Sequence, residues 1–344
     1  MQFISRLQHL FLSRVAFSNI ESATTLLRTL AKYSTKIKDL KLRGFDAYKS
    51  YEPQLFHALF HAIIQIIKSQ EQLMLINLDG INNDSRFHGI ISALECQKNS
   101  LQEAIIKGCD WSAEFEILKN CKNLDTFRIR SCGTKLLKSL ICKISILDID
   151  EYRDVSTTNQ ILEMSGLMLK RLKLALKIEV DEEASILELE ALKSFCPNIT
   201  YLNLHNIELS TQLIEVIGNL QKLQFLTLHL FWDNIDEIKE ELEARVISFA
   251  EILPLTLQYL KFCGSLQLNS CIDIFLNHCN APLKTLSIHS LRDEKTVKAL
   301  IEFCKRYRTL NYVGLYYFYL NDNIRKKVEK YVRLESYEYF DVDC

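Results

Sequence analysis

The sequence predicts an α/β solenoid, in which short parallel strands form a curved sheet on a concave face and helices cover a convex face. Three observations support this fold class. One apolar spacing recurs thirteen times along the 344 residues. The segments between the recurrences show helical periodicity, and no hairpin signal joins one strand to the next. Strand, helix and strand in this order indicate parallel strands connected by right-handed crossovers.

The strand signal is the spacing apolar-x-x-apolar-x-apolar. It is clearest in "CPNITYLNLHNIEL" at 196–209 and "CKNLDTFRIRSC" at 121–132. The units begin at Leu7, Ile37, Leu73, Leu101, Leu124, Ile144, Leu169, Ile199, Leu223, Leu257, Leu283, Leu310 and, more weakly, Leu334. The 327 residues from the first to the last make twelve steps, so the mean period is about 27 residues. This period is typical of leucine-rich repeats. We expect one leucine-rich-repeat solenoid of 12–13 units over residues 1–344, without a second domain.

Helices are predicted in the linkers between these strands. Segment 293–308 places Val297, Leu300, Ile301 and Cys304 on one face, with acidic residues at its start and basic residues at its end. Similar periodicity occurs at 54–70, 183–195 and 236–253. One strand and one helix hold too little core to fold alone, so neighbouring units must stack.

Composition excludes several classes of protein. Apolar residues make up 48% of the chain and charged residues 25%, as in globular proteins. The 42 basic and 43 acidic side chains give a net charge of -1, without the basic excess of a nucleic-acid-binding protein. Apolar runs fall short of the ~18 residues that span a bilayer. We therefore expect neither nucleic acid nor membrane as a partner.

Eleven cysteines without a secretory signal indicate reduced thiols in the cytoplasm or nucleus. Several lie at equivalent places in the repeat: Cys121 and Cys196 just before a strand, Cys109 and Cys132 nine residues into a unit. We expect them to be buried apolar fillers of a recurring slot. Residues 1–19 also resemble a mitochondrial presequence, since they hold two arginines and no acid. The alternative is that they are the first repeat, in register with the others.

No catalytic, cofactor or metal site is predicted, so the protein is not expected to be an enzyme. His57 and His61 stand four residues apart, but the catalytic Glu of the H-E-x-x-H motif is missing. No C-x-x-C pair suggests zinc. Acidic pairs such as Asp148 and Asp150 are more typical of solvated strand residues. No Ser or Cys nucleophile has a base at a supporting spacing.

The predicted concave face changes character along the chain. If the apolar positions point inward, the third, fifth and seventh residues of each unit point to the concave side. In the earlier units these residues are Asp39, Lys41, Arg43, Asn77, Asp79, Glu103, Lys107, Arg128, Arg130, Asp148, Asp150, Arg171 and Lys173. From Ile199 onward they are Tyr201, Asn203, His205, Phe225, His229, Tyr259, Lys261, His289, Tyr312 and Tyr316.

We expect these later residues to form two rows across the strands. One row holds His205, His229, Cys263, His289 and Tyr316, and the other Tyr201, Phe225, Tyr259 and Tyr312. Aromatic side chains with a polar end are enriched at protein interfaces. We predict that a protein partner contacts Tyr201, His205, Phe225, His229, Tyr259, His289, Tyr312 and Tyr316. The alternative is that the rings only pack on each other and shield the sheet. A metal on the His and Cys row is a weaker hypothesis, because regular spacing does not converge on one point.

The helix-to-strand junctions resemble those of F-box proteins with leucine-rich repeats, particularly the large fungal sets. "CPNITYLNL" at 196–204 and "CKNLDTFRI" at 121–129 carry the resemblance, and "CNAPLKTLSI" at 279–288 is a looser version. The resemblance implies that the repeats hold the substrate of an SCF-type ubiquitin ligase, while an F-box binds the ligase adaptor.

The chain departs from that family at its start. Only six residues precede Leu7, and no F-box opening is found, so an adaptor is expected as a partner only if an F-box is supplied upstream. The first repeat also lacks the polar cap that repeat arrays need. We expect an upstream segment or another chain to cover it. The alternative function is regulation of an enzyme, in the manner of ribonuclease inhibitors or GTPase activators.

Overall fold

The computed structural model divides into two compact units, Met1–Ser165 (unit 1) and Gly166–Cys344 (unit 2). The described residues are 4–13, 19–44, 53–80, 89–109, 112–130, 132, 144–150, 155–175, 182–230, 239–264, 266–291, 293–316 and 321–336. The expectation of a single array without a second domain stays a prediction.

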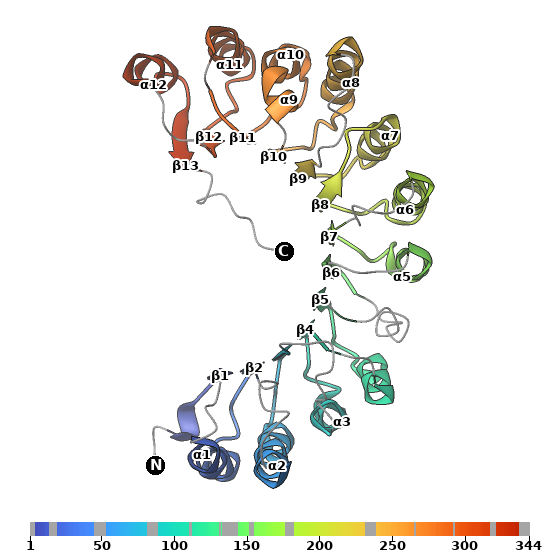
Figure 1. The fold of residues 1–344 in the computed structure, drawn as a ribbon, viewed down its shortest axis with the longest axis vertical. Coiled ribbons are helices and arrows are strands. Elements are labelled where there is room, and N and C mark those ends of the chain that lie inside the picture. The colour runs from blue at the N-terminus through green and yellow to red at the C-terminus, as the bar shows by residue number, and fades with distance from the viewer. Residues whose placement is uncertain are drawn as a thin grey trace. The chain divides into compact units, whose positions relative to one another are not determined.

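The described part of unit 1 contains six strands in chain order, and each strand pairs in parallel with the next (Figure 1). The strands are β1 (His9–Ser13), β2 (Asp39–Arg43), β3 (Leu75–Asp79), β4 (Glu103–Lys107), β5 (Thr126–Arg130) and β6 (Ile146–Asp150). The helical elements are η1 (Ile4–Arg6), α1 (Ile20–Tyr33), α2 (Pro53–Ser69), α3 (Ile90–Ala93), η3 (Leu94–Gln97), η4 (Ala113–Asn120) and α5 (Val155–Ser165).

Unit 2 repeats this plan with seven strands, again parallel and in chain order. The strands are β7 (Arg171–Ala175), β8 (Tyr201–Ile207), β9 (Phe225–Leu230), β10 (Tyr259–Cys263), β11 (Thr285–Ile288), β12 (Tyr312–Leu315) and β13 (Arg333–Ser336). The helices are α6 (Glu182–Phe195), α7 (Thr211–Asn219), α8 (Lys239–Ile252), α9 (Leu266–Ser270), α10 (Ile272–His278), α11 (Glu294–Tyr307) and α12 (Asp322–Val328).

The predicted fold class is confirmed: thirteen parallel strands alternate with helical segments, as in leucine-rich-repeat solenoids. The four predicted helices correspond to α2, α6, α8 and α11. The Asp293 carboxylate caps α11 by accepting a hydrogen bond from the Thr296 N–H at 2.7 Å. This cap explains why the acidic residues stand at the start of that helix.

The register of the last unit was predicted wrongly. Leu334 was expected to be the first apolar residue of its unit, but it pairs with Val313, which is the second apolar residue of β12. Leu334 and Val332 are the buried residues of this segment. The prediction relied on Tyr337 and Tyr339, which lie outside the described residues.

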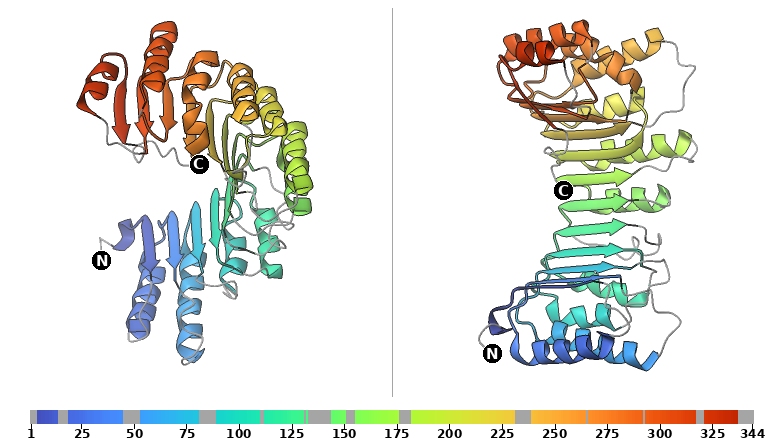
Figure 2. Two further views of the ribbon diagram at one scale, coloured as in Figure 1. Left: turned by 45° about the horizontal axis from the view of Figure 1, so that its top comes forward. Right: turned by 60° about the vertical axis from the view of Figure 1, so that its left-hand side comes forward.

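In each unit the helices lie along one side of the strands (Figures 1 and 2). The inward residues of the strands are buried against that helical layer. Leu202 and Leu204 of β8, which pair with leucines of β7, are examples. Phe249 of α8, Phe262 of β10 and Phe275 of α10 add a ring cluster, with centroids 5.4–6.1 Å apart. The opposite side of the strands is called the open face below. It corresponds to the predicted concave face.

A recurring slot at the end of the helical segment is filled in two ways. Cys121, Cys196 and Cys279 are buried there, and burial raises the pKa of the Cys196 thiol to about 12. The prediction that these cysteines are buried fillers is thus confirmed. Burial also raises the pKa of the Cys279 thiol to about 12, so the thiols of Cys196 and Cys279 stay protonated near neutral pH and are poor nucleophiles.

In unit 1 two buried glutamines fill the same slot, which the sequence had not indicated. The Gln70 amide donates to the carbonyl of Ser34 at 2.9 Å, and its oxygen accepts from the Ile37 N–H at 2.8 Å. Gln97 repeats this in the next unit by accepting from the Leu73 N–H at 3.1 Å. These amides join neighbouring repeats by satisfying backbone groups that would otherwise be buried without partners.

Glycine follows the seventh position in several units because the backbones come close there. Gly264 has a φ of 91°, and a Cβ on it would lie 2.7 Å from the carbonyl oxygen of Leu230. Gly108 has a φ of 56°, and its Cβ would lie 2.6 Å from the carbonyl oxygen of Gly80. Only glycine fits both the left-handed backbone and this contact.

No helix in the described part of the chain is both long enough and apolar enough to cross a membrane.

Stacked repeats should lose stability together when one strand is broken. Leu202 is fully buried in β8, so Leu202→Asp places an unpaired charge between repeats and should lower the free energy of unfolding by more than about 3 kcal/mol. Leu255→Asp is the control, because Leu255 is exposed, and should change it by less than about 0.5 kcal/mol. Urea denaturation followed by circular dichroism measures both. Equal midpoints for the two variants would show that the register is wrong.

The first strand should be the least protected of unit 1. Among the described residues β1 pairs only with β2, and Leu10 and Leu12 are half-buried whereas their partners Leu40 and Leu42 are buried. Hydrogen exchange monitored by mass spectrometry should therefore be faster in β1 than in β2 or β8. Equal protection of β1 and β8 would mean that something covers the first repeat.

Candidate protein-binding face

The open face of unit 2 brings the sequence-predicted residues into adjacent rows. Each repeat unit that contains one of the strands β7 to β12 contributes its third, fifth and seventh residues, counted from the first apolar residue of the unit. Parallel pairing aligns residues of the same position. The rows are described in turn as the third-position row, the middle row and the seventh-position row.

The seventh-position row contains two ring stacks. His205 and His229 are paired residues of β8 and β9, and their imidazoles are nearly parallel with centroids 3.7 Å apart. His289 and Tyr316 stack with centroids 5.7 Å apart. Cys263 pairs with His229 and lies between the two stacks. The histidines and Cys263 are half-buried, whereas Tyr316 is 57% exposed.

The third-position row begins with a cation. The Arg171 guanidinium of β7 lies 4.6 Å from the ring centroid of Tyr201. The ring of Phe225 follows at 6.3 Å from Tyr201, and that of Tyr259 at 6.0 Å from Phe225. Cation–π and offset ring contacts of this kind stabilise a face by roughly 0.5–1.5 kcal/mol each.

Tyr312 lies in the same row, as predicted, but it is not adjacent to Tyr259. Thr285 of β11 pairs with both Tyr259 and Tyr312 and separates them. Tyr312 instead contacts the Arg333 guanidinium of β13, which lies 5.5 Å from its ring centroid. The sequence argument had passed over the threonine because it followed only the aromatic residues.

Two predicted contact residues are buried rather than exposed. Tyr201 is 3% exposed and Tyr259 is 4% exposed, whereas Phe225 and Tyr312 are half-buried. Strands only ~4.8 Å apart force adjacent large rings against each other, so most of their surface is lost to neighbours. For these two tyrosines the alternative interpretation, that rings shield the sheet, describes the structure better.

The middle row is buried although it lies on the open side of the strands. Asn203, Thr227 and Ser287 are small or polar, and Lys261 between the last two is only 2% exposed. The sequence located this lysine on the open face but did not indicate its burial, because burial depends on packing with residues that are distant in the sequence.

The open face of unit 1 has different chemistry: its charges pair across neighbouring strands. His9 Nδ1 lies 2.6 Å from Asp39 Oδ2, and Arg43 Nε lies 3.3 Å from Asp79 Oδ2. The Arg128 guanidinium donates to Glu103 at 3.0 Å.

The pair between Arg130 and Asp148 joins β5 to β6. Arg130 Nη2 donates to Asp148 Oδ2 at 2.9 Å, and the Asp148 side chain is 0% exposed. A buried carboxylate needs its partner, because removal of one charge leaves the other desolvated.

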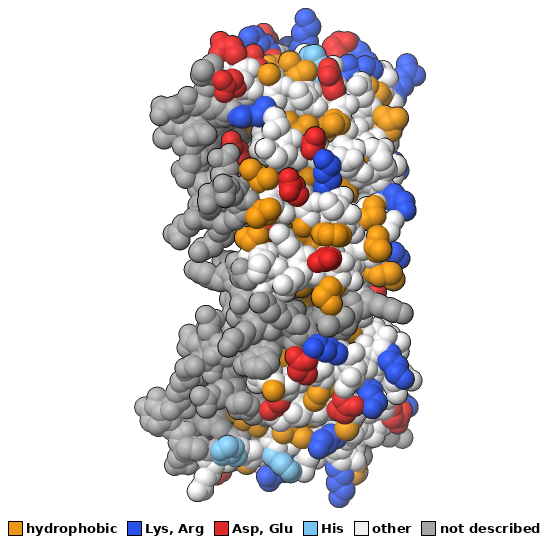
Figure 3. All heavy atoms as spheres, turned by 90° about the vertical axis from the view of Figure 1, so that its right-hand side faces the viewer, with side chains coloured by type: hydrophobic (Ala, Val, Ile, Leu, Met, Phe, Trp, Pro, Cys, Tyr) orange, Lys and Arg blue, Asp and Glu red, His pale blue; other side chains and the backbone are white. Residues whose placement is uncertain are grey.

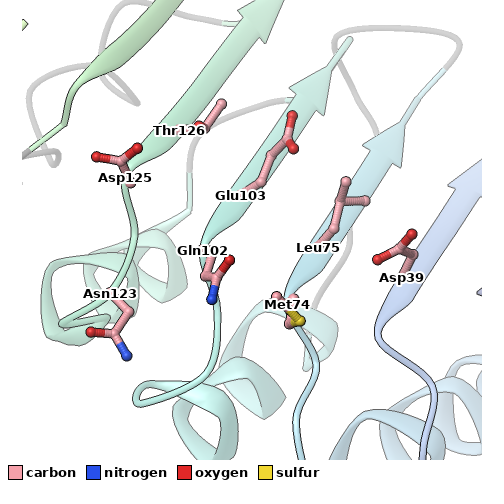
Figure 4. Close-up of a pocket in the computed structure, with 8 residues that line it drawn as sticks. All are labelled: Asp39, Met74, Leu75, Gln102, Glu103, Asn123, Asp125 and Thr126. Carbon is pink, nitrogen blue, oxygen red and sulfur yellow. The ribbon is translucent and has the colours of Figure 1, made fainter. Parts of the chain in front are cut away.

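A shallow hollow opens near the start of strands β2 to β5 in unit 1 (Figure 4). Its acidic side chains are Asp39, Glu103 and Asp125, and the first two are the partners of His9 and Arg128. Among the described residues no group of three or more His, Cys, Asp or Glu is arranged to hold a metal ion. Two of the three carboxylates that line the hollow therefore belong to ion pairs of the face.

Other predicted or considered residues do not converge on a site. His57 and His61 are both exposed on α2. The helical side seen in Figure 3 shows basic and acidic side chains interspersed over its described part. Mixed signs of this kind are typical of a solvated surface.

Comparison with known proteins finds similar chains among solved structures at low sequence identity. No protein-family profile and no curated protein matches the chain. Among solved structures the chain is similar to one from the yeast Rad7 and Elc1 complex, with 18% identity over 90% of this chain and 70% of that chain (TM-score 0.49). It is also similar to the leucine-rich repeat-containing protein LegL7 of Legionella pneumophila, with 14% identity over 87% and 91% (TM-score 0.46). A Listeria monocytogenes internalin gives 12% identity over 92% and 94% (TM-score 0.42).

Removal of the arginine that neutralises a buried carboxylate should destabilise unit 1. Arg130→Ala leaves Asp148 without this partner and should lower the free energy of unfolding by about 3 kcal/mol. Arg43→Ala is the matched control, because that pair is largely exposed and should contribute under about 1 kcal/mol. Chemical denaturation measures both, and the double variant Arg130→Ala/Asp148→Ala should recover much of the loss. Equal losses for Arg43→Ala and Arg130→Ala would contradict the buried-pair interpretation.

Proposed function

We propose that this protein is a non-catalytic protein-interaction module and that the open face of unit 2 binds its partner. The observation that supports the proposal most is the ring-lined seventh-position row, which lies on the side of the strands away from the helices and ends in the exposed Tyr316. Rings with a polar edge provide large contact area at low entropic cost. Such residues dominate binding energy at protein interfaces.

The eight predicted contact residues divide into two roles in this proposal. Tyr316 and the half-buried rings contact the partner: His205, Phe225, His229, His289 and Tyr312. The buried Tyr201 and Tyr259 hold Phe225 between them and so fix its orientation. A surface whose rings are already ordered loses little conformational entropy when it binds.

We further propose that the module is the substrate-recognition part of an SCF-type ubiquitin ligase or a relative of it. The support is the resemblance of the junctions at 121–129 and 196–204 to F-box proteins with leucine-rich repeats. Twelve units of one spacing, followed by a further parallel strand, also support a single array over the whole chain. The alternative function is regulation of one enzyme, and the identity of the partner separates the two.

A reducing compartment, the cytoplasm or nucleus, fits the cysteines. The nine in the described part of the chain are all free thiols, and most of them are buried. Oxidising compartments favour disulfides instead.

Site-specific cross-linking tests the binding face. A photoreactive phenylalanine analogue at Tyr316 should cross-link a partner protein in cells, and the same analogue at Tyr331 should not, since Tyr331 is exposed but precedes β13. Mass spectrometry identifies the partner: a ligase adaptor with a cullin supports the ligase role, and a single enzyme supports the regulator. Absence of a cross-link at 316 together with one at Phe11, on the open face of unit 1, would contradict the proposal.

The affinity for that partner should depend on the exposed ring. Tyr316→Ala should weaken binding by about 1–2 kcal/mol, measured by calorimetry with the purified partner. Phe11→Ala is the matched control, because Phe11 is 59% exposed and points from β1 to the open face of unit 1. It should leave the affinity unchanged. If the two variants lose the same affinity, the binding face is not in unit 2.

A further inference from the structure

We propose that Cys109 and Cys132 form a reversible disulfide that joins two neighbouring repeats of unit 1 when the chain meets a hydroperoxide. Both side chains are thiols in the structure. The inference goes beyond the proposed function, because it assigns a redox-sensitive site to unit 1 whereas the proposed binding face lies in unit 2. It comes from the contact between the two cysteines and from their equivalent positions in successive repeats.

The two cysteines lie opposite each other at the ends of paired strands. β4 and β5 pair in parallel through Lys107 and Arg130, and the Gly108 N–H extends the ladder by donating to the Arg130 carbonyl at 2.9 Å. Each cysteine follows its paired residue by two positions, so the same register places Cys109 opposite Cys132. Adjacent strands lie ~4.8 Å apart, and the Cα atoms of a disulfide lie about 4.4–6.8 Å apart. The backbone spacing therefore suits a disulfide.

The Cys132 sulfur already lies over the neighbouring repeat. It accepts a hydrogen bond from the Cys109 N–H at 3.4 Å, and its thiol donates to the carbonyl of Ile106 in β4 at 3.5 Å. The Cys109 sulfur and nitrogen are carried by the same Cα, so rotation about the Cα–Cβ bond moves the Cys109 sulfur relative to the sulfur that this nitrogen contacts. The disulfide can therefore form by side-chain rotation, without a change in strand register.

The pair of cysteines is specific to these two repeats. Of the thirteen units recognised in the sequence, only those that begin at Leu101 and Leu124 have cysteine as their ninth residue. In unit 2 the same position holds larger apolar side chains, such as the buried Ile207 and Leu291. A slot that larger aliphatic side chains also fill does not by itself call for two adjacent thiols.

The oxidation balances with hydrogen peroxide as the two-electron oxidant. The Cys132 thiolate attacks one peroxide oxygen, the O–O bond breaks, and the leaving oxygen takes the proton of this thiol to form water and a sulfenic acid. The Cys109 sulfur then attacks the sulfenic sulfur. The S–S bond forms, the S–O bond breaks, and the departing oxygen takes the Cys109 proton to form a second water. Two electrons pass from the sulfurs to the peroxide.

Exposure sets the order of these steps. Cys132 is 5% exposed and Cys109 is 0% exposed, so the peroxide reaches Cys132 first. The Cys109 sulfur then acts as the resolving thiol, and a resolving thiol beside a sulfenic acid favours a disulfide over further oxidation. In a reducing compartment thiol exchange restores both thiols. The link therefore lasts only while oxidant is present.

Peptide mapping of the full-length chain tests the proposal. Trypsin, which cleaves after Lys and Arg, separates Cys109, Cys121 and Cys132 into the peptides 108–119, 120–122 and 131–135. The folded chain is treated with hydrogen peroxide, the remaining thiols are alkylated, and the digest is analysed by mass spectrometry without reduction. The Cys109 peptide should be linked to the Cys132 peptide, and dithiothreitol should remove the link.

Cys121 is the matched control. It is also buried, but it precedes β5 whereas Cys132 follows β5, so the two lie at opposite ends of that strand. A link between the Cys109 and Cys121 peptides should therefore form only when the chain is oxidised in urea. Equal amounts of both links in the folded chain would overturn the proposal. So would the lack of any link to Cys132 under conditions that oxidise the exposed Cys96.

Stability gives a second measurement. The disulfide closes a loop between residues 109 and 132 and so lowers the entropy of the unfolded chain. The urea midpoint should rise after peroxide treatment. Cys132→Ala should abolish this rise, and Cys121→Ala should retain it. A linked chain with a lowered midpoint would show that the folded repeats do not accommodate the bond, and it would overturn the proposal. The peptide map of the unaltered chain does not depend on either variant.

Discussion

Burial of the strand leucines between stacked repeats is the constraint on which the rest of the structure depends. A residue such as Leu202 is buried only because strands on both sides and the helical layer surround it. No unit can satisfy this requirement alone, so the register of each strand is fixed by its neighbours. The glycines after the strands and the buried amides of Gln70 and Gln97 follow from the same closeness of adjacent backbones.

Fixed register turns the open side of each sheet into a set of aligned rows, and the side chains in those rows then decide its chemistry. In unit 1 opposite charges occupy neighbouring strands and form pairs such as Arg130 with Asp148. In unit 2 rings occupy neighbouring strands and stack, as His205 does on His229. Ion pairs order the first face, whereas ring stacking orders the second. The stacked rings are the physical basis for proposing that the partner binds unit 2.

Ring packing also limits which residues on the open face of unit 2 a partner can contact. Tyr201 and Tyr259 are buried by Phe225, Arg171 and the surrounding chain, so a partner meets the half-buried residues and Tyr316 instead. The buried tyrosines act through their neighbours. The buried Lys261 is likewise not exposed to a partner. The proposed binding face therefore includes only some of the aromatic residues on this side of the strands.

The sequence by itself determined the repeat, its mean period, the strand positions of twelve units and the side of the strand on which each residue lies. These follow from local spacing, because burial alternates with a period of two along a strand. Only the tertiary structure decided the register of the last strand, the burial of Tyr201 and Lys261, and the pairing of Arg130 with Asp148. It also showed that Gln70 and Gln97 replace cysteine in a shared slot. Each of these depends on side chains from neighbouring repeats, which are about 27 residues apart in the sequence. A local sequence pattern does not determine how such side chains pack.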